Sequence, residues 1–209
     1  MKRYDSKQNK RSKNHAQASR AGSTLNSQQN TQTTRARARR DDSTRVARRR
    51  QKLVEAYCEG IATAEKLAEP KGIYVHSTQQ ACNELSHWLP ENATAAYFGL
   101  CTLGDELDRY FRNLVENDLA SASVLNEVAL AWIVNITQDL HQRVRDEVGQ
   151  NGLKTGAAYR PGLGRWPLDV QKTVFAELPA EQIGVCLSES LVMKPGFSTS
   201  LVIPILTSK

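Results

Sequence analysis

A glycine-rich segment holds the residues best suited to bind a small polar ligand. Residues 159–167 read Tyr-Arg-Pro-Gly-Leu-Gly-Arg-Trp-Pro. Gly162 and Gly164, which flank Leu163, can adopt a positive φ and let the backbone approach a ligand closely. Arg160 and the second arginine of the segment can each bind a carboxylate through two hydrogen bonds. The pattern suits a ligand that carries both an amino-acid group and a planar base, although an ordinary surface loop can have the same composition.

A second candidate site lies in residues 183–205, which the apolar pattern predicts to be two strands joined by a turn at Pro195-Gly196. Polar residues cluster near the middle of these strands: Ser188, Glu189, Ser190, Ser198, Thr199 and Ser200. Strict alternation places Glu189 on the same face as Leu187 and Leu191. A carboxylate buried there needs a partner. That partner is either a backbone amide or arginine of the chain itself, or a ligand or partner protein.

The charge of the chain is divided unevenly along its length. Residues 1–50 carry 15 Lys and Arg against 3 Asp, whereas the remaining 159 residues carry 13 Lys and Arg against 19 Asp and Glu. The first 42 residues contain Leu25 as their one large aliphatic residue. Such a segment cannot bury enough apolar surface to offset an ordering entropy of roughly 1–2 kcal/mol per residue. We therefore expect a disordered basic tail over residues 1–42 and one domain over residues 43–209.

Arginines are dense around the predicted boundary: Arg35, Arg37, Arg39, Arg40, Arg45, Arg48, Arg49 and Arg50. Contacts between such a cluster and phosphates would depend strongly on salt. Few aromatic residues are interleaved, so the segment does not indicate base stacking. The cluster predicts binding to nucleic acid or to an acidic protein, and non-specific attraction of anions explains the same pattern.

Helical spacing, caps and apolar runs predict the elements that position these segments. Helices are expected near residues 43–69, 77–89, 105–117, 119–148 and 166–178, and strands near 72–76, 95–103 and in the two halves of 183–205. The run 95–103 is apolar on both faces, which is typical of a strand that is covered on both sides. We expect an α+β fold in which a mostly antiparallel sheet packs with helices, the longest helix being its main packing partner.

The sequence contains no pattern that requires catalysis by side chains. No Ser-His-Asp arrangement, metal-ligand spacing or CxxC pair is present, so neither a catalytic residue nor a metal site is expected. His141, near Arg145 at helical spacing, is expected to be solvated. Cys101 and Cys186 lie in apolar runs and are expected to be buried, reduced thiols.

The sequence also indicates where the protein works. It has no run of about 18 apolar residues that would span a membrane. It has no apolar segment after its basic start, as a secretory signal would. We therefore expect a cytoplasmic protein that contacts no membrane.

Three segments together resemble the activation domain of cobalamin-dependent methionine synthase, over about residues 50–206. The first, residues 99–109, is similar to the strand, Thr-Leu-Gly and Asp-Arg helix of that family. The second, residues 161–168, is similar to the Pro-Gly-Tyr-Gly-x-Trp-Pro-Leu run of its short stand-alone members. The third is the Leu-x-Glu-Ser…Met-x-Pro-Gly-x-Ser-x-Ser pattern between Leu187 and Ser200. The resemblance implies the fold of that domain in a divergent, stand-alone member.

The resemblance implies S-adenosylmethionine as the ligand, with cobalamin carried by a partner. That partner would be a corrinoid-binding protein or a methionine synthase that lacks its own activation domain. In this family, reduced cobalamin is methylated by S-adenosylmethionine. The alternative from a different class is a non-catalytic interaction module that is anchored by its basic tail.

The family's ligand loop reads Arg-x-x-Pro-Gly-Tyr. Alignment on Arg160-Pro161 keeps its arginine but places Arg165 at the tyrosine. Alignment on Pro161-Gly162 places Ala158 at the arginine and Leu163 at the tyrosine. The residues implied for the ligand are Arg160, Gly162, Leu163, Gly164, Glu189 and Ser190. Those implied for docking on the partner are Pro195, Gly196 and Ser198.

Overall fold

The computed structural model describes residues 42–207. The chain divides into two units, Met1–Glu55 and Ala56–Lys209, and residues 42–67 are helical. Four arginines of the predicted anion-binding tail lie outside the described residues: Arg35, Arg37, Arg39 and Arg40. The predicted domain boundary at residue 42 stays a prediction.

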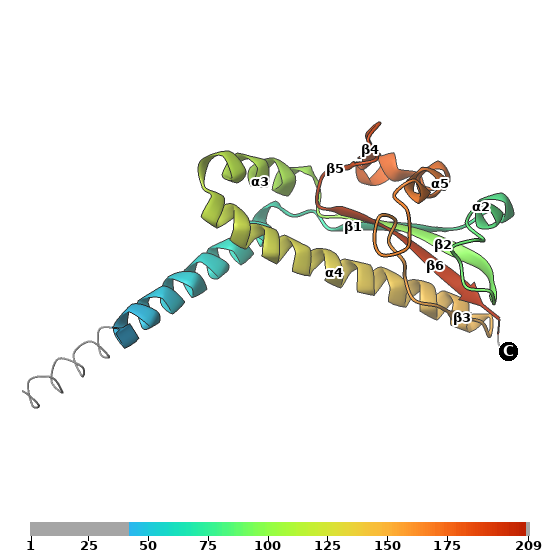
Figure 1. Cartoon of the computed structure of the whole chain (residues 1–209), viewed down its shortest axis with the longest axis horizontal. Coiled ribbons are helices and arrows are strands. Elements are labelled where there is room, and N and C mark those ends of the chain that lie inside the picture. Colours follow the sequence, from blue (N-terminus) through green and yellow to red (C-terminus); the bar gives the residue numbers. More distant parts are fainter. Residues whose placement is uncertain (1–41, 208–209) are drawn as a thin grey trace, which may run out of the picture. The chain divides into compact units, whose positions relative to one another are not determined.

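A four-stranded antiparallel sheet forms the centre of the second unit (Figure 1). Its order is β1 (Lys71–His76), β2 (Ala93–Thr102), β6 (Ser198–Leu206) and β3 (Lys154–Thr155). The central strands β2 and β6 pair along their whole length, from Ala93 opposite Leu206 to Thr102 opposite Ser198. The expected α+β fold with a mostly antiparallel sheet is confirmed.

Both faces of the sheet are buried, as the apolar run in β2 predicted. Ala96, Phe98 and Leu100 face one hydrophobic cluster, which α2 (Gln79–Glu84), α5 (Val170–Glu177) and the 3-10 helix η1 (Ala180–Ile183) complete. Tyr97 and Cys101, on the opposite face, pack with α4 (Leu119–Gln150). The period of two along the strand therefore divides its side chains between two separate cores.

The helix α4 is the main packing partner of the sheet, as expected. It is 32 residues long and contacts all four strands of the sheet, β1, β2, β3 and β6. By length and a mean hydropathy of 1.5 it is also the one helix of residues 42–207 that reaches the values of a membrane span. Leu125, Ile133, Leu140 and Val144 are among its buried residues, whereas only 28% of its most apolar window is buried within the domain. The absence of membrane contact stays a prediction.

Local signals explain where the shorter helices begin and end. Thr78 caps α2, since its side chain accepts a hydrogen bond from the amide of Ala81. The helix α3 (Asp105–Asn117) follows Gly104 and carries three acids in its first turn, where they favour the helix dipole. Its bounds are those that the sequence predicted. The helix α5, expected from Trp166, begins at Val170, because residues 167–169 form a turn that leads into it.

The long hairpin predicted for residues 183–205 is wrong. β4 (Cys186–Leu187) and β5 (Met193–Lys194) form a separate two-stranded sheet with two residues in each strand. The chain then passes through Pro195-Gly196 and joins the main sheet as β6. The apolar pattern of the two halves was correct, but the second half pairs with β2, which lies far away in the sequence.

Candidate functional site

The glycine-rich loop is fixed to the sheet at its start. Tyr159 forms an isolated bridge with Val202 of β6, in which each amide donates to the other's carbonyl at 2.8 Å. The ring of Tyr159 stacks on that of Trp166, with centroids 4.9 Å apart. Trp166 is buried in the hydrophobic cluster that also contains Val170 and Val174 of α5. The two aromatic residues close the base of the loop, so residues 160–165 project from a rigid support.

Arg160 connects this loop to α4. Its side chain is half-buried, and one guanidinium nitrogen donates to Thr137 Oγ1 at 3.3 Å. Its charge also acts on Cys101, where it partly opposes the burial that raises the pKa of that thiol to about 12. A guanidinium has five N–H donors, so Arg160 keeps donors for a carboxylate ligand after the contact with Thr137.

The tip of the loop presents backbone to solvent. Gly162 and Gly164 have φ values of +84° and +64°, which residues with side chains rarely adopt. The amide of Gly162 donates to the carbonyl of Trp166 at 3.0 Å, and this bond closes the turn. Leu163 is 63% exposed, and Arg165 donates to the carbonyl of Trp88 at 3.0 Å. Of the two arginines, only Arg160 reaches α4.

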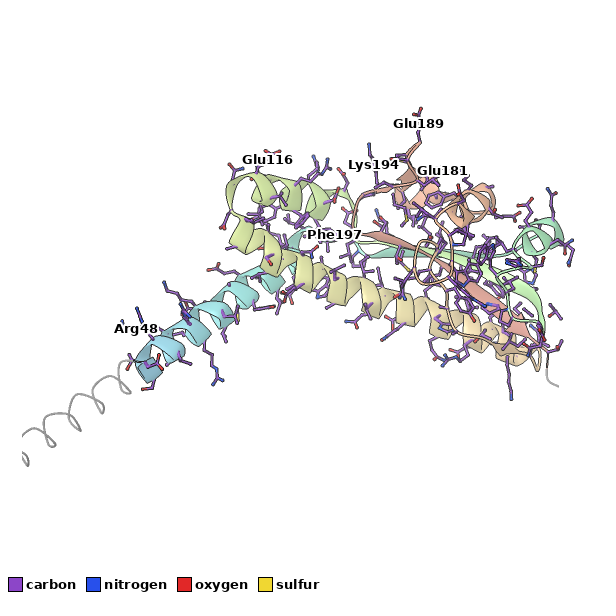
Figure 2. All side chains as sticks on the ribbon, in the orientation of Figure 1. Arg48, Glu116, Glu181, Glu189, Lys194 and Phe197 are labelled. Atoms are coloured by element: carbon purple, nitrogen blue, oxygen red, sulfur yellow. The ribbon has the colours of Figure 1, made fainter. Side chains whose placement is uncertain are left out.

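Glu189 lies at the tip of a tight turn rather than inside a strand. The side chain of Ser188 accepts from the amide of Val192 at 3.0 Å, and Leu191 adopts a φ of +61°. This turn breaks the alternation on which the buried position of Glu189 was based, so that prediction is wrong. Figure 2 shows Glu189 pointing away from the neighbouring elements. Ser190 is also exposed, with its hydroxyl 3.1 Å from that of Ser188.

The three residues predicted to dock on a partner differ in exposure. Gly196 is exposed, whereas Pro195 is buried. Ser198 is half-buried and donates to Thr102 Oγ1 at 2.9 Å. At Gly196, an added Cβ would lie 2.8 Å from Asp108 Oδ1. The glycine therefore lets the chain pass close to α3, which is a structural reason for its presence beside any role in docking.

Two predictions about single residues are wrong. Cys186 is exposed, because β4 is short and lies outside the main sheet, whereas Cys101 is buried as expected; all four cysteines are free. His141 is half-buried rather than solvated, and its Nε2 atom has no partner within the described residues. Burial, with a smaller contribution from Arg145, lowers the pKa of His141.

We expect this histidine to make the domain less stable in mild acid. Because the pKa is lower in the folded than in the unfolded chain, the unfolded chain binds the proton first. The contribution of neutral His141 to the free energy of unfolding is complete above 6.5, the usual pKa of histidine. It is lost as the pH falls from 6.5 toward the lower pKa of His141 in the folded chain. Urea unfolding at about pH 7.5 and about pH 5.5 should show this loss, and H141Q should reduce it. The exposed His87 provides the control, since H87Q should keep the pH dependence; an equal reduction in both variants would contradict the assignment.

The comparisons with known proteins define the class of fold. No family model and no curated protein matches the sequence. The chain is similar to a solved structure described as the MetH reactivation domain bound to AdoHcy, with a TM-score of 0.50 and 17% sequence identity. The match covers 75% of this chain and 65% of that chain, which is less than two thirds of the known structure. The chain therefore has a fold of the reactivation-domain type.

Proposed function

We propose that the chain is a stand-alone activation-domain-like protein that binds S-adenosylmethionine and docks on a corrinoid protein. The partner would be a corrinoid-binding protein, or a methionine synthase without an activation domain, whose cobalamin is methylated during reactivation. The observation that carries this proposal is the likeness in fold to a MetH reactivation domain that was solved with AdoHcy bound.

The loop residues support a ligand of this kind. Arg160 would bind the carboxylate of S-adenosylmethionine, because it is held by Thr137 and keeps further donors. Gly162 and Gly164 let the backbone approach the ligand, and the exposed Leu163 offers an apolar contact. The ligand supplies the methyl group, and the role of the protein is to bind and orient it. No acid or base of the chain is needed for that role.

The exposed turn at Glu189 and Ser190, together with Gly196, would form the surface that docks on the partner. These residues lie at or beside the β4–β5 sheet, outside the core of the domain. Glu189 forms no hydrogen bond or ion pair within residues 42–207, so a partner can approach its carboxylate directly. Pro195, which is buried, and Ser198, which is half-buried, would hold the backbone of this surface in place.

The ligand site can be tested by calorimetry with S-adenosylmethionine. We expect binding to the wild type and a loss of at least about tenfold in affinity for R160A, since a hydrogen bond to a charged group contributes about 1.5–3 kcal/mol. R165A is the matched control, because Arg165 lies in the same loop but is directed to Trp88. Equal affinities in wild type and R160A would contradict the assignment, and the absence of heat at millimolar ligand would contradict the proposed function.

A second candidate function rests on the exposed arginines of residues 42–55. Arg48, labelled in Figure 2, lies on this helix with Arg45, Arg49 and Lys52. Counted from Arg45, the other three lie three, four and seven positions further along, so the four share one side of the helix. All are exposed. Such a stripe would bind the phosphates of a nucleic acid or an acidic protein, with Arg35, Arg37, Arg39, Arg40 and Arg50 adding charge.

We expect the affinity of the chain for a short nucleic-acid duplex to fall steeply between about 50 and 200 mM salt. The variant R45Q/R48Q/R49Q should weaken binding and reduce the slope of log affinity against log salt by about one for each phosphate contact that is lost. Filter binding measures both quantities. The matched control is R109Q/R112Q, which removes exposed arginines from α3. A similar loss in this control would show that the stripe has no special role.

A further inference from the structure

A cavity of ≈ 290 Å³ lies between β1 and α4. It is separate from the glycine-rich loop, none of whose residues lines it. β1 is an edge strand, so the cavity lies at the side of the sheet. Residues of β1, β2 and α4 contribute to its lining, among them Lys71, Tyr74, Cys101, Asp139, Leu140 and Arg143.

The floor of this cavity is apolar. Cys101 and Leu140 are buried there, and the adjacent Gly72 has no side chain. A Cβ atom at Gly72 would lie 3.3 Å from Leu140 Cδ1 and 3.5 Å from Cys101 Sγ. A side chain at this position would press on Leu140, so glycine keeps Leu140 and Cys101 uncovered in the lining of the cavity. A short aliphatic chain fits such surroundings better than a polar group does.

Two opposite charges stand at the mouth of the cavity, one turn apart on α4. Asp139 and Arg143 are both exposed, and neither forms a hydrogen bond or ion pair with another side chain of the described range. Lys71, the other cation of the lining, is paired with Glu69 at 2.9 Å. The hydroxyl of Tyr74 donates to Glu147, and this hydrogen bond raises the pKa of Tyr74. The positive charge of Arg143 is near enough to lower that pKa in part. The mouth thus offers one carboxylate and one guanidinium that are available to a ligand.

We propose that this cavity binds a small α-amino acid with an aliphatic side chain. Arg143 would bind the carboxylate of the ligand and Asp139 its ammonium group, both through charge-assisted hydrogen bonds. The aliphatic side chain would lie on Leu140 and Cys101. Pockets that take drug-sized ligands measure about 300–1,000 Å³, and this cavity is at the lower limit of that range. It therefore suits a free amino acid better than a nucleoside-bearing ligand.

Calorimetry on the full chain with L-leucine as the probe tests this site. We expect leucine to bind, and both 4-methylpentanoate, which lacks the ammonium group, and 3-methylbutylamine, which lacks the carboxylate, to bind at least about tenfold more weakly. R143Q and D139N should each weaken leucine binding by a similar factor. The matched controls are R145Q and D146N, which change exposed residues of α4 outside the cavity lining and should bind leucine like the wild type.

A second measurement locates the ligand independently of the variants. In methyl NMR spectra, leucine should shift the resonances of Leu140 and Ile136, which line the cavity, and leave those of Val170 and Val174 in α5 unchanged. The proposal would be overturned by absence of leucine binding, by a truncated analogue that binds as tightly as leucine, or by unshifted methyl resonances. S-adenosylmethionine and leucine are titrated separately into the wild-type chain, so a failure of S-adenosylmethionine binding and a failure of this site can be told apart.

Discussion

Replacing Gly99 with valine should lower the free energy of unfolding by about 1–3 kcal/mol. Gly99 is buried in β2 beneath α4, and a Cβ atom there would lie 2.9 Å from Leu140 Cδ2 and 3.5 Å from Leu201 Cβ. Valine adds two further methyl groups at this point. Its better strand propensity relieves a glycine penalty of about 0.5–1 kcal/mol, which is smaller than the overpacking cost. Urea denaturation monitored by circular dichroism measures the change.

The cause of this loss can be separated from a general effect of glycine replacement. Gly149, near the end of α4, has no atom within 4 Å of an added Cβ, so G149A should stabilise the domain by about 0.5–1 kcal/mol. The double variant G99V/L140A should be more stable than the sum of the single effects predicts, by about 0.5–3 kcal/mol, because Leu140 no longer opposes valine. Additive effects in this cycle would show that Gly99 is needed for some other reason.

Replacing Phe197 with alanine should cost about 3–5 kcal/mol. Phe197, labelled in Figure 2, follows the Pro195-Gly196 turn and is 6% exposed. Its ring packs edge-on against Phe111 of α3, with centroids 5.1 Å apart. It belongs to the hydrophobic cluster that includes Leu103, Leu107 and Leu125. This one side chain therefore joins the start of β6 to α3 and α4, and its removal leaves a cavity between them.

The control for this variant is V192A, which removes two methyl groups from a side chain that is 55% exposed in the same part of the chain. Its effect should stay within about 0.5 kcal/mol. F197L should lie between the two, because leucine refills part of the space. Thermal and urea unfolding should show the largest loss of stability for F197A, a smaller loss for F197L and the smallest for V192A. A cost for F197A as small as that of V192A would contradict the central role of Phe197.

Local rules predicted most elements of the domain. The bounds of α3 follow from Gly104 and the acidic first turn, and the run 95–103 identified the doubly covered strand β2. The pairing of strands was beyond such rules. Residues 183–205 contain two apolar runs with a turn between them, and nothing in their pattern shows that β6 prefers β2 to its neighbour in sequence. That choice depends on the burial of β6 between two cores.

The candidate site was predicted less well, for a related reason. The positive φ angles of Gly162 and Gly164 follow from residue type. The contact of Arg160 with Thr137 depends on how α4 crosses the sheet, which the sequence does not reveal. The position of Glu189 was wrong, because Ser188 replaces strand hydrogen bonds with a side-chain turn. The cavity beside Gly72 had no signal except a glycine at the start of a strand.

The pairing of β2 with β6 has a consequence for how fast the domain folds. The hydroxyls of Thr102 and Ser198, which meet at the end of this pair, are separated by 96 positions in the chain. A long loop of the chain must close before any of these contacts forms. The chain therefore loses conformational entropy before contacts in the core can compensate for that loss. The helix α4, by contrast, depends on contacts within each turn and can form early. Folding should therefore be slow for a domain of this size, with docking of β6 beside β2 and against α4 as the late event.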